Sequence, residues 1–135
     1  MPKRPGIVPL NPASEAFARY CELMPTVTDV RGEEVAFDLG SYTHFTRREG
    51  RERYVVWIRE TLENPNEIRH DFDRRHPERE LYVRRLLPDE AADEETFIVV
   101  VTRRVGLYFW TAFSAEAWYV SKVERGKLLW SAEDS

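Results

Sequence analysis

Cysteine is almost absent from this chain of 135 residues, which carries the single cysteine Cys21. One cysteine excludes an internal disulfide, and no Cys/His spacing indicates a structural zinc site. No apolar run approaches the roughly 20 residues that span a bilayer, and residues 1–10 lack the long apolar core of a signal peptide. We therefore expect a soluble, cytoplasmic protein without a membrane segment.

Motifs that would place the chain in a large enzyme class are missing as well. The sequence has six glycines but no glycine-rich phosphate loop, and no GxSxG, HExxH or EF-hand pattern, so kinase, serine-hydrolase and zinc-protease classes lose support. Its three histidines have no fixed spacing, and we expect no metal and no other cofactor. A formal net charge of −4 argues against a protein that coats nucleic acid through bulk positive charge.

Charge is unevenly distributed along the chain. Arginines concentrate in its middle, at residues 47–53 and 69–85, whereas acidic residues cluster at 89–95. A local basic face can bind a phosphate backbone even when the whole protein is acidic. The distribution of charge is therefore compatible with a nucleic-acid substrate.

The hydrophobic pattern predicts a single α+β domain over residues 13–130, after an extended proline-rich arm (1–12) and before a frayed tail (131–135). The first part reads as a helix that ends before Pro25 and a β-hairpin over 26–30 and 34–39. After a break at Gly40 and Ser41, residues 49–63 have helical spacing, and Pro65 terminates that helix.

Four β-like runs follow the central helix, at residues 67–72, 80–87, 97–103 and 105–113. Their short connections favour an antiparallel meander, because parallel pairing needs a longer crossover. Residues 97–101 are apolar at every position, so we expect that strand to be covered on both faces. The predicted fold is an N-terminal helix and β-hairpin, with a central helix packed on a four-stranded antiparallel meander sheet.

The candidate site begins at His44, which is predicted just ahead of the central helix, where unpaired backbone amides favour anions. Its imidazole can exchange a proton near neutral pH, and Arg47 or Arg48 can hold a phosphate with a planar fork of donors. Metal-free RNA cleavage needs such a base for the 2′-hydroxyl and such a cation for the phosphate. The alternative is a surface histidine beside solvated arginines.

Later strands offer an opposite wall for this site. Thr111 is predicted on the same side as Phe109, and its hydroxyl would bond either to a phosphate oxygen or to the backbone. Arg84 and Arg85 point to opposite faces of their strand, so only one of them can share a site with Thr111. Tyr82 is a candidate for stacking on a base, although core packing is the alternative for an aromatic residue in a strand.

Several segments, taken in order, resemble the BECR nucleases, the group of barnase, EndoU, colicin and RelE-like enzymes. The resemblance is to the domains of this group in phage and mobile-element polyvalent proteins, and it covers roughly residues 26–130. It implies an α+β, nuclease-like domain that cleaves RNA without metal to leave a 2′,3′-cyclic phosphate. The segments are VTDVRGEEVAFDL, THFTRR, TLENPNEI, ELYVRRLL, FIVVVTR, GLYFWTAF and KVERGKLLW.

The resemblance also implies roles for three residues. By position, His44 looks like the family's basic residue near the helix start, Arg47 its companion arginine and Thr111 the hydroxyl residue of the late strand. Such domains often have a second histidine followed by Pro and Glu, where this chain reads Arg48-Glu49-Gly50. The general acid is therefore unassigned.

The leading hypothesis is a small endoribonuclease of toxin or mobile-element type. In it His44 is the general base, Arg47 and one of Arg84 and Arg85 bind phosphate, and Thr111 orients it. An antitoxin or immunity protein is the expected partner, because a free ribonuclease harms its host. The alternatives are an inactive module of the same fold that binds RNA or a protein, and a structural or inhibitory mimic; the oligomeric state is left open.

Overall fold

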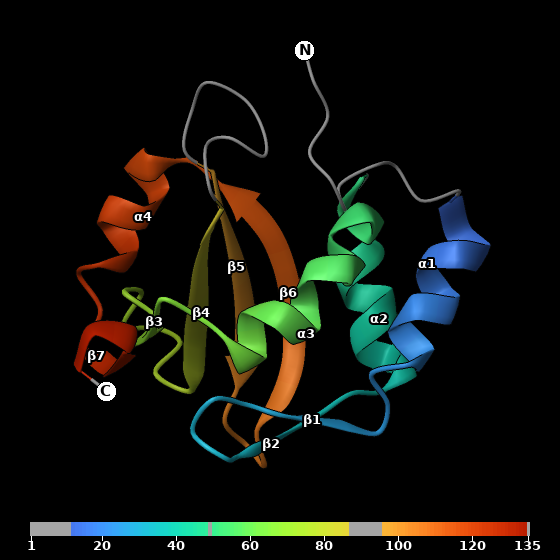
Figure 1. Cartoon of the computed structure of the whole chain (residues 1–135), viewed down its shortest axis with the longest axis horizontal. Coiled ribbons are helices and arrows are strands. Elements are labelled where there is room, and N and C mark those ends of the chain that lie inside the picture. The colour runs from blue at the N-terminus through green and yellow to red at the C-terminus, as the bar shows by residue number, and fades with distance from the viewer. Residues whose placement is uncertain (1–11, 49, 87–95, 135) are drawn as a thin grey trace.

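The computed structural model describes residues 12–48, 50–86 and 96–134, which form an α+β domain around a curled seven-stranded sheet (Figure 1). Except for Pro12, the predicted N-terminal arm lies outside the described residues, as does the acidic segment 89–95. The elements in chain order are α1 (Pro12–Cys21), β1 (Thr26–Thr28), β2 (Glu34–Ala36), α2 (Leu39–Thr46), η1 (Arg51–Tyr54), α3 (Val55–Glu63), β3 (Glu67–His70), β4 (Arg79–Leu86), β5 (Thr96–Arg103), β6 (Tyr108–Ala115), α4 (Ala117–Val123), β7 (Leu128–Ser131) and η3 (Ala132–Asp134).

The sheet has the strand order β1-β2-β6-β5-β4-β3-β7. The four predicted strands are β3 to β6, and each pairs antiparallel with the next. The sheet is nevertheless larger than predicted and mixed. The hairpin of β1 and β2 joins it through a parallel pairing of Ala36 with Tyr108, and β7 pairs antiparallel with β3. The α+β prediction is confirmed, and the four-stranded sheet is corrected to seven strands.

The tail expected to fray from Ser131 is also corrected. Ser131 belongs to β7 and pairs with Glu67 of β3, and a 3-10 turn follows it. Gly126 makes the approach of β7 possible, because a Cβ there would lie 2.0 Å from the backbone oxygen of His70. None of the helices in the described part of the chain is long and apolar enough to cross a bilayer.

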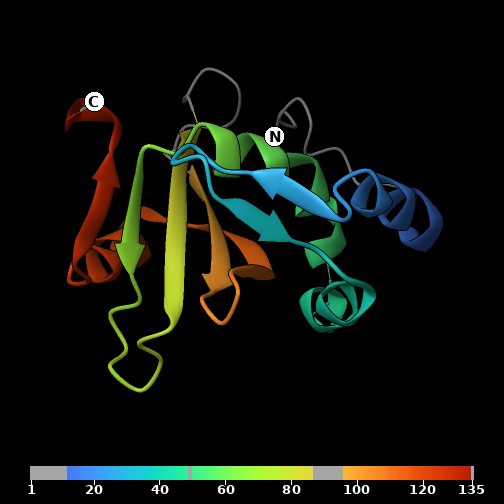
Figure 2. The ribbon, with the colours of Figure 1, turned by 90° about the horizontal axis from the view of Figure 1, so that it is seen from below.

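Two apolar clusters sandwich the sheet. Helices α1, α2 and α3 contribute to the cluster on one face, and α4 contributes to the cluster on the other. Figure 2 shows α1 and α2 at the end of the molecule away from β7. Strand β5 serves both, since Ile98 and Val100 belong to the first cluster and Val99 and Val101 to the second. The prediction that this strand is covered on both faces is confirmed.

The central helix ends where the sequence predicts, with Asn64 as its C-cap residue, directly before Pro65. Its beginning differs, because residues 51–54 form a 3-10 turn after Gly50, whose φ of +83° suits glycine. The predicted break at residues 40–41 is helix α2. Asp38 caps that helix, and its Oδ1 accepts a hydrogen bond of 2.7 Å from the backbone N–H of Ser41.

A buried polar network joins the β1–β2 hairpin to β4. The Tyr82 hydroxyl donates to Asp29 Oδ2 at 2.6 Å, and Arg31 donates to the Tyr82 hydroxyl and to Glu80 Oε1, both at 2.8 Å. Burial alone would raise the pKa of Glu80, but hydrogen bonds from Arg104 and Arg31 outweigh it and lower that pKa. These contacts hold the hairpin against the meander.

Candidate functional site

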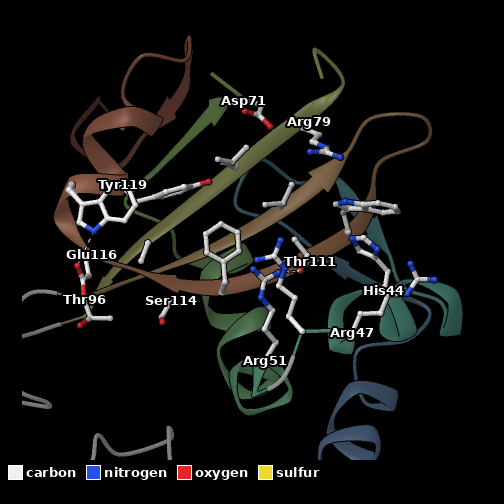
Figure 3. A pocket seen from close by; sticks show the side chains of 17 residues that line it. His44, Arg47, Arg51, Asp71, Arg79, Thr96, Thr111, Ser114, Glu116 and Tyr119 are labelled. Carbon is white, nitrogen blue, oxygen red and sulfur yellow. Dashed lines mark hydrogen bonds between the residues drawn. The ribbon is translucent and has the colours of Figure 1, made fainter. Parts of the chain in front are cut away.

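A cavity of about 950 Å³ lies on the α4 face of the sheet (Figure 3). Apolar side chains of the central strands contribute to its lining, among them Leu81, Val101 and Phe113. Helix α2 and the arginines that follow it form one wall, and α4 forms the facing wall. Its volume lies in the range of small-molecule and cofactor sites.

Four of the predicted site residues line this cavity: His44, Arg47, Arg48 and Thr111. They come from α2, the segment after it and β6, so the structure brings together residues far apart in the chain. His44 lies in the last turn of α2, which corrects its predicted place before the N-terminus of the central helix. Arginine side chains, rather than helix amides, therefore supply the positive charge around it.

The other three predicted residues do not line the cavity. Tyr82 is 0% exposed and belongs to the cluster under α1–α3, so its proposed stacking on a base is corrected to a core role. Arg84 Nη1 donates to the backbone oxygen of Asn64 at 2.7 Å on the α3 side. Arg85 is exposed and lies outside the cavity lining.

A β-bulge in β6 turns Thr111 toward the cavity. Val101 pairs with Thr111 while Thr102 pairs with Phe109, so Trp110 is the extra residue. Phe109 lies in the core cluster on the helix face, whereas Trp110 and Thr111 both line the cavity. The predicted sharing of one side by Phe109 and Thr111 is therefore wrong, because strict alternation stops at the bulge.

Thr111 makes its hydrogen bond to an arginine that the sequence does not single out. Arg51 Nη1 donates to Thr111 Oγ1 at 3.0 Å (Figure 3), and the Arg51 guanidinium also lies 5.0 Å from the centre of the Phe113 ring. Thr111 is 8% exposed, so its hydroxyl is well placed to hold Arg51. This contact replaces the phosphate and backbone partners predicted for Thr111. Arg51 lies in an arginine-rich run, and the sequence pattern gives no reason to choose it over the neighbouring arginines.

The imidazole of His44 stacks on the indole of Trp110, with ring centroids 3.8 Å apart and an interplanar angle of 29°. Its pKa is lowered from the ordinary value of 6.5. Burial is the first cause, and four nearby cations add to it: Arg47, Arg79, Arg51 and Arg103. His44 is therefore mainly neutral at pH 7 and able to accept a proton.

The cavity holds four arginines that form no ion pair with a carboxylate of the described residues. Burial first, and then the charge of Arg48, lower the pKa of Arg51, but arginine stays protonated in proteins. Such a cluster favours an anion with several acceptor oxygens, such as a phosphodiester. The four arginines are Arg47, Arg48, Arg51 and Arg79.

The facing wall contributes groups that the sequence does not reveal. Trp118 and Tyr119 of α4 line the cavity, and Trp118 is 60% exposed. Two carboxylates, Asp71 and Glu116, also line it. Across residues 12–48, 50–86 and 96–134, no group of three or more His, Cys, Asp and Glu residues has the arrangement of a metal site.

Comparison with protein families gives one match, which covers residues 15–131. The matching family is described as phage-Barnase-EndoU-ColicinE5/D-RelE like nuclease2, or PBECR2. The chain belongs to the PBECR2 family. Comparisons with curated proteins and with solved structures gave no match. Membership confirms the predicted resemblance to phage-type BECR nucleases, and it supports nuclease function in general.

The PBECR2 cavity combines groups suited to phosphodiester chemistry. It holds an imidazole of lowered pKa on α2, guanidinium groups that form no ion pair with the described carboxylates, and an exposed indole on the facing wall. An imidazole accepts a proton, guanidinium groups bind phosphate oxygens, and an indole stacks on a base. The geometry therefore suits a nucleic-acid substrate, in keeping with the nuclease family.

Proposed function

We propose that this PBECR2 protein is a metal-independent endoribonuclease of toxin or mobile-element type. It cleaves RNA by attack of a ribose 2′-hydroxyl on the adjacent phosphate, which leaves a 2′,3′-cyclic phosphate and a 5′-hydroxyl. The observation that carries the proposal is the placement of His44, with its lowered pKa, in one cavity with four arginines. The two features supply a proton acceptor and an anion site at the same place.

His44 is the general base in this mechanism. The arginines around it disfavour the imidazolium, so the ring is free to accept the 2′-hydroxyl proton at neutral pH. Its stacking on Trp110 fixes the plane of the ring. DNA has no 2′-hydroxyl to give up a proton, and it is therefore not a substrate for this reaction.

The arginines bind the phosphate and stabilise its transition state. Negative charge grows on the non-bridging oxygens as the fifth bond to phosphorus forms, so fixed cations favour the transition state over the ground state. We assign this role to Arg47, Arg51 and Arg79, which takes the place of the role predicted for Arg84 or Arg85. Thr111 positions Arg51 through the hydrogen bond that it accepts from that side chain. Arg48 also lines the cavity and is exposed.

The cavity also bears on the alternative of an inactive module of the same fold. A module that only binds a protein needs no proton acceptor among phosphate-binding groups, whereas His44, Arg47 and Thr111 line one cavity here. This favours the enzyme. An antitoxin or immunity protein is the partner that we propose with it, and a surface that fills the cationic cavity would inhibit the enzyme by charge complementarity.

The test is to incubate the purified protein with total RNA in EDTA. We expect cleavage to fragments with 2′,3′-cyclic phosphate ends, and a loss of about 10²–10⁴-fold in His44→Ala. His76→Ala is the matched control, because His76 lies outside the cavity lining. No cleavage by the wild-type protein, or equal cleavage by His44→Ala, would refute the proposal.

A further inference from the structure

The proposed cleavage needs a second proton-transfer group, and the residues adjacent to His44 contain none. The 5′-oxygen leaves as an alkoxide unless it receives a proton, so general-acid catalysis accelerates its departure. The two carboxylates in the cavity already accept hydrogen bonds. Glu116 Oε2 accepts from the Trp118 indole at 2.9 Å, and Asp71 Oδ1 accepts from the backbone N–H of Asp73 at 2.8 Å.

Tyr119 presents a hydroxyl group to the cavity from the facing wall. It lies in helix α4, and its ring makes edge-on contacts with Phe72 and Phe113, with centroids 6.1 and 5.5 Å apart. Figure 3 shows the hydroxyl directed into the cavity. Within the described part of the chain, no other residue forms a hydrogen bond with that hydroxyl. The ring is therefore fixed while its proton is available.

The charges around Tyr119 keep it protonated and relate it to His44. Burial first, and then the charge of Asp71, raise its pKa above the ordinary value of 10.0, while Arg51 and Arg79 act in the opposite direction. The same two arginines lower the pKa of His44, so both rings lie within electrostatic range of them. In Figure 3, Arg51 lies between Tyr119 and His44.

This arrangement suits an in-line displacement, in which the attacking and leaving oxygens lie on opposite sides of phosphorus. A phosphate held by Arg51 would have the imidazole toward one side and the phenol toward the other. A neutral phenol is also a stronger acid than the alcohol that leaves, because its ordinary pKa is about 10. Position and acidity therefore agree.

We propose that Tyr119 is the general acid, which donates its hydroxyl proton to the departing 5′-oxygen. The inference rests on the proposed ribonuclease function. In the cleavage step the 2′-oxygen gives its proton to His44 and bonds to phosphorus, the bond between phosphorus and the 5′-oxygen breaks, and the Tyr119 proton passes to that oxygen. The imidazolium and the phenolate then return to their resting states by proton exchange with water.

The experiment compares two substrates in the wild-type protein and in Tyr119→Phe. One is an RNA dinucleotide, and the other is a nucleoside 3′-(4-nitrophenyl phosphate), whose nitrophenolate leaves without needing a proton. We expect Tyr119→Phe to lower kcat/KM for the dinucleotide by about 10²-fold and to leave that for the nitrophenyl ester nearly unchanged. His44→Ala should lower both. Tyr108→Phe is the matched control, because Tyr108 does not line the cavity.

The other outcomes distinguish failure of the Tyr119 assignment from failure of the ribonuclease function. If Tyr119→Phe cleaves both substrates as the wild type does, Tyr119 is not the acid, and the ribonuclease function stands. If it loses activity equally on both, Tyr119 shapes the site or binds substrate without transferring a proton, and the inference is overturned. If the wild-type protein cleaves neither substrate, the ribonuclease function itself fails.

Discussion

The hydrogen bond between Arg51 and Thr111 can be removed by Thr111→Val, which keeps the shape of the side chain. In the wild type, Arg51 Nη1 lies 3.0 Å from Thr111 Oγ1, and Thr111 is 8% exposed. The substitution leaves the Arg51 side chain and its charge in place. It therefore tests whether Thr111 acts through Arg51 or touches the phosphate itself.

The size of the effect follows from the two contacts that hold Arg51. A hydrogen bond with a charged partner contributes about 1.5–3 kcal/mol. The guanidinium keeps its place 5.0 Å from the centre of the Phe113 ring, a contact that offsets part of the loss. We therefore expect a loss at the lower end, about 1.5 kcal/mol of transition-state stabilisation, which is slightly more than tenfold in kcat/KM.

The assay is a double-mutant cycle on RNA cleavage with Thr111→Val, Arg51→Gln and the double variant. If Thr111 only positions Arg51, Thr111→Val should have almost no effect once Arg51 has been replaced. Thermal unfolding of each variant controls for loss of fold. Fully additive effects would refute this reasoning, and they would support the role as a phosphate ligand that the sequence predicts for Thr111.

Two further predictions concern charge. Since the pKa of His44 is lowered, kcat/KM should rise with pH with an apparent pKa below the ordinary histidine value of 6.5. Arg47→Gln removes one of the charges that lower the pKa, so it should move this rise to higher pH. An apparent pKa above 6.5 in the wild type would contradict the assignment of His44 as the base. Glu80→Gln should lower the free energy of unfolding, measured in urea, by about 3 kcal/mol, because it breaks a largely buried ion pair. The control is Glu33→Gln, which should lower it by under about 1 kcal/mol, because the Glu33 side chain is 42% exposed. Since the pKa of Glu80 is lowered in the folded state, Glu80 stabilises the fold at pH values above its pKa in the unfolded chain, and this stabilisation is lost as pH falls through its pKa in the folded protein. Equal losses of stability in Glu80→Gln and Glu33→Gln would refute the role of the buried network.

Local patterns predicted the parts of the fold that depend on neighbouring residues. The buried stripe of Val55, Ile58 and Leu62 and the stop before Pro65 are as expected, and so are the four strands of the meander. The pairing of β2 with β6 and of β7 with β3 joins segments far apart in the chain, and no local pattern encodes it. Helix α2 was missed because Gly40 suggested a break, although Asp38 is a good capping residue.

The sequence predicts residues of the candidate site correctly as cavity-lining where they belong to one short segment. His44, Arg47 and Arg48 belong to one short stretch, and all three line the cavity. Arg84 and Tyr82 differ, because the side of a strand that faces a site depends on where the covering helices lie. Here α1–α3 cover the side of β4 that carries Tyr82, and the cavity lies on the other.

Thr111 and Tyr119 show why three-dimensional placement changes the mechanism as well as the residue list. Alternation put Thr111 beside Phe109, and only the bulge at Trp110 turns its hydroxyl toward Arg51. A search of the sequence close to His44 assigns no second proton-transfer group, and Arg47 and Arg48, which follow His44, line the same wall of the cavity. An in-line displacement needs its acid on the opposite side of phosphorus from its base, so the facing wall is the place to look, and the hydroxyl directed into the cavity from that wall belongs to Tyr119.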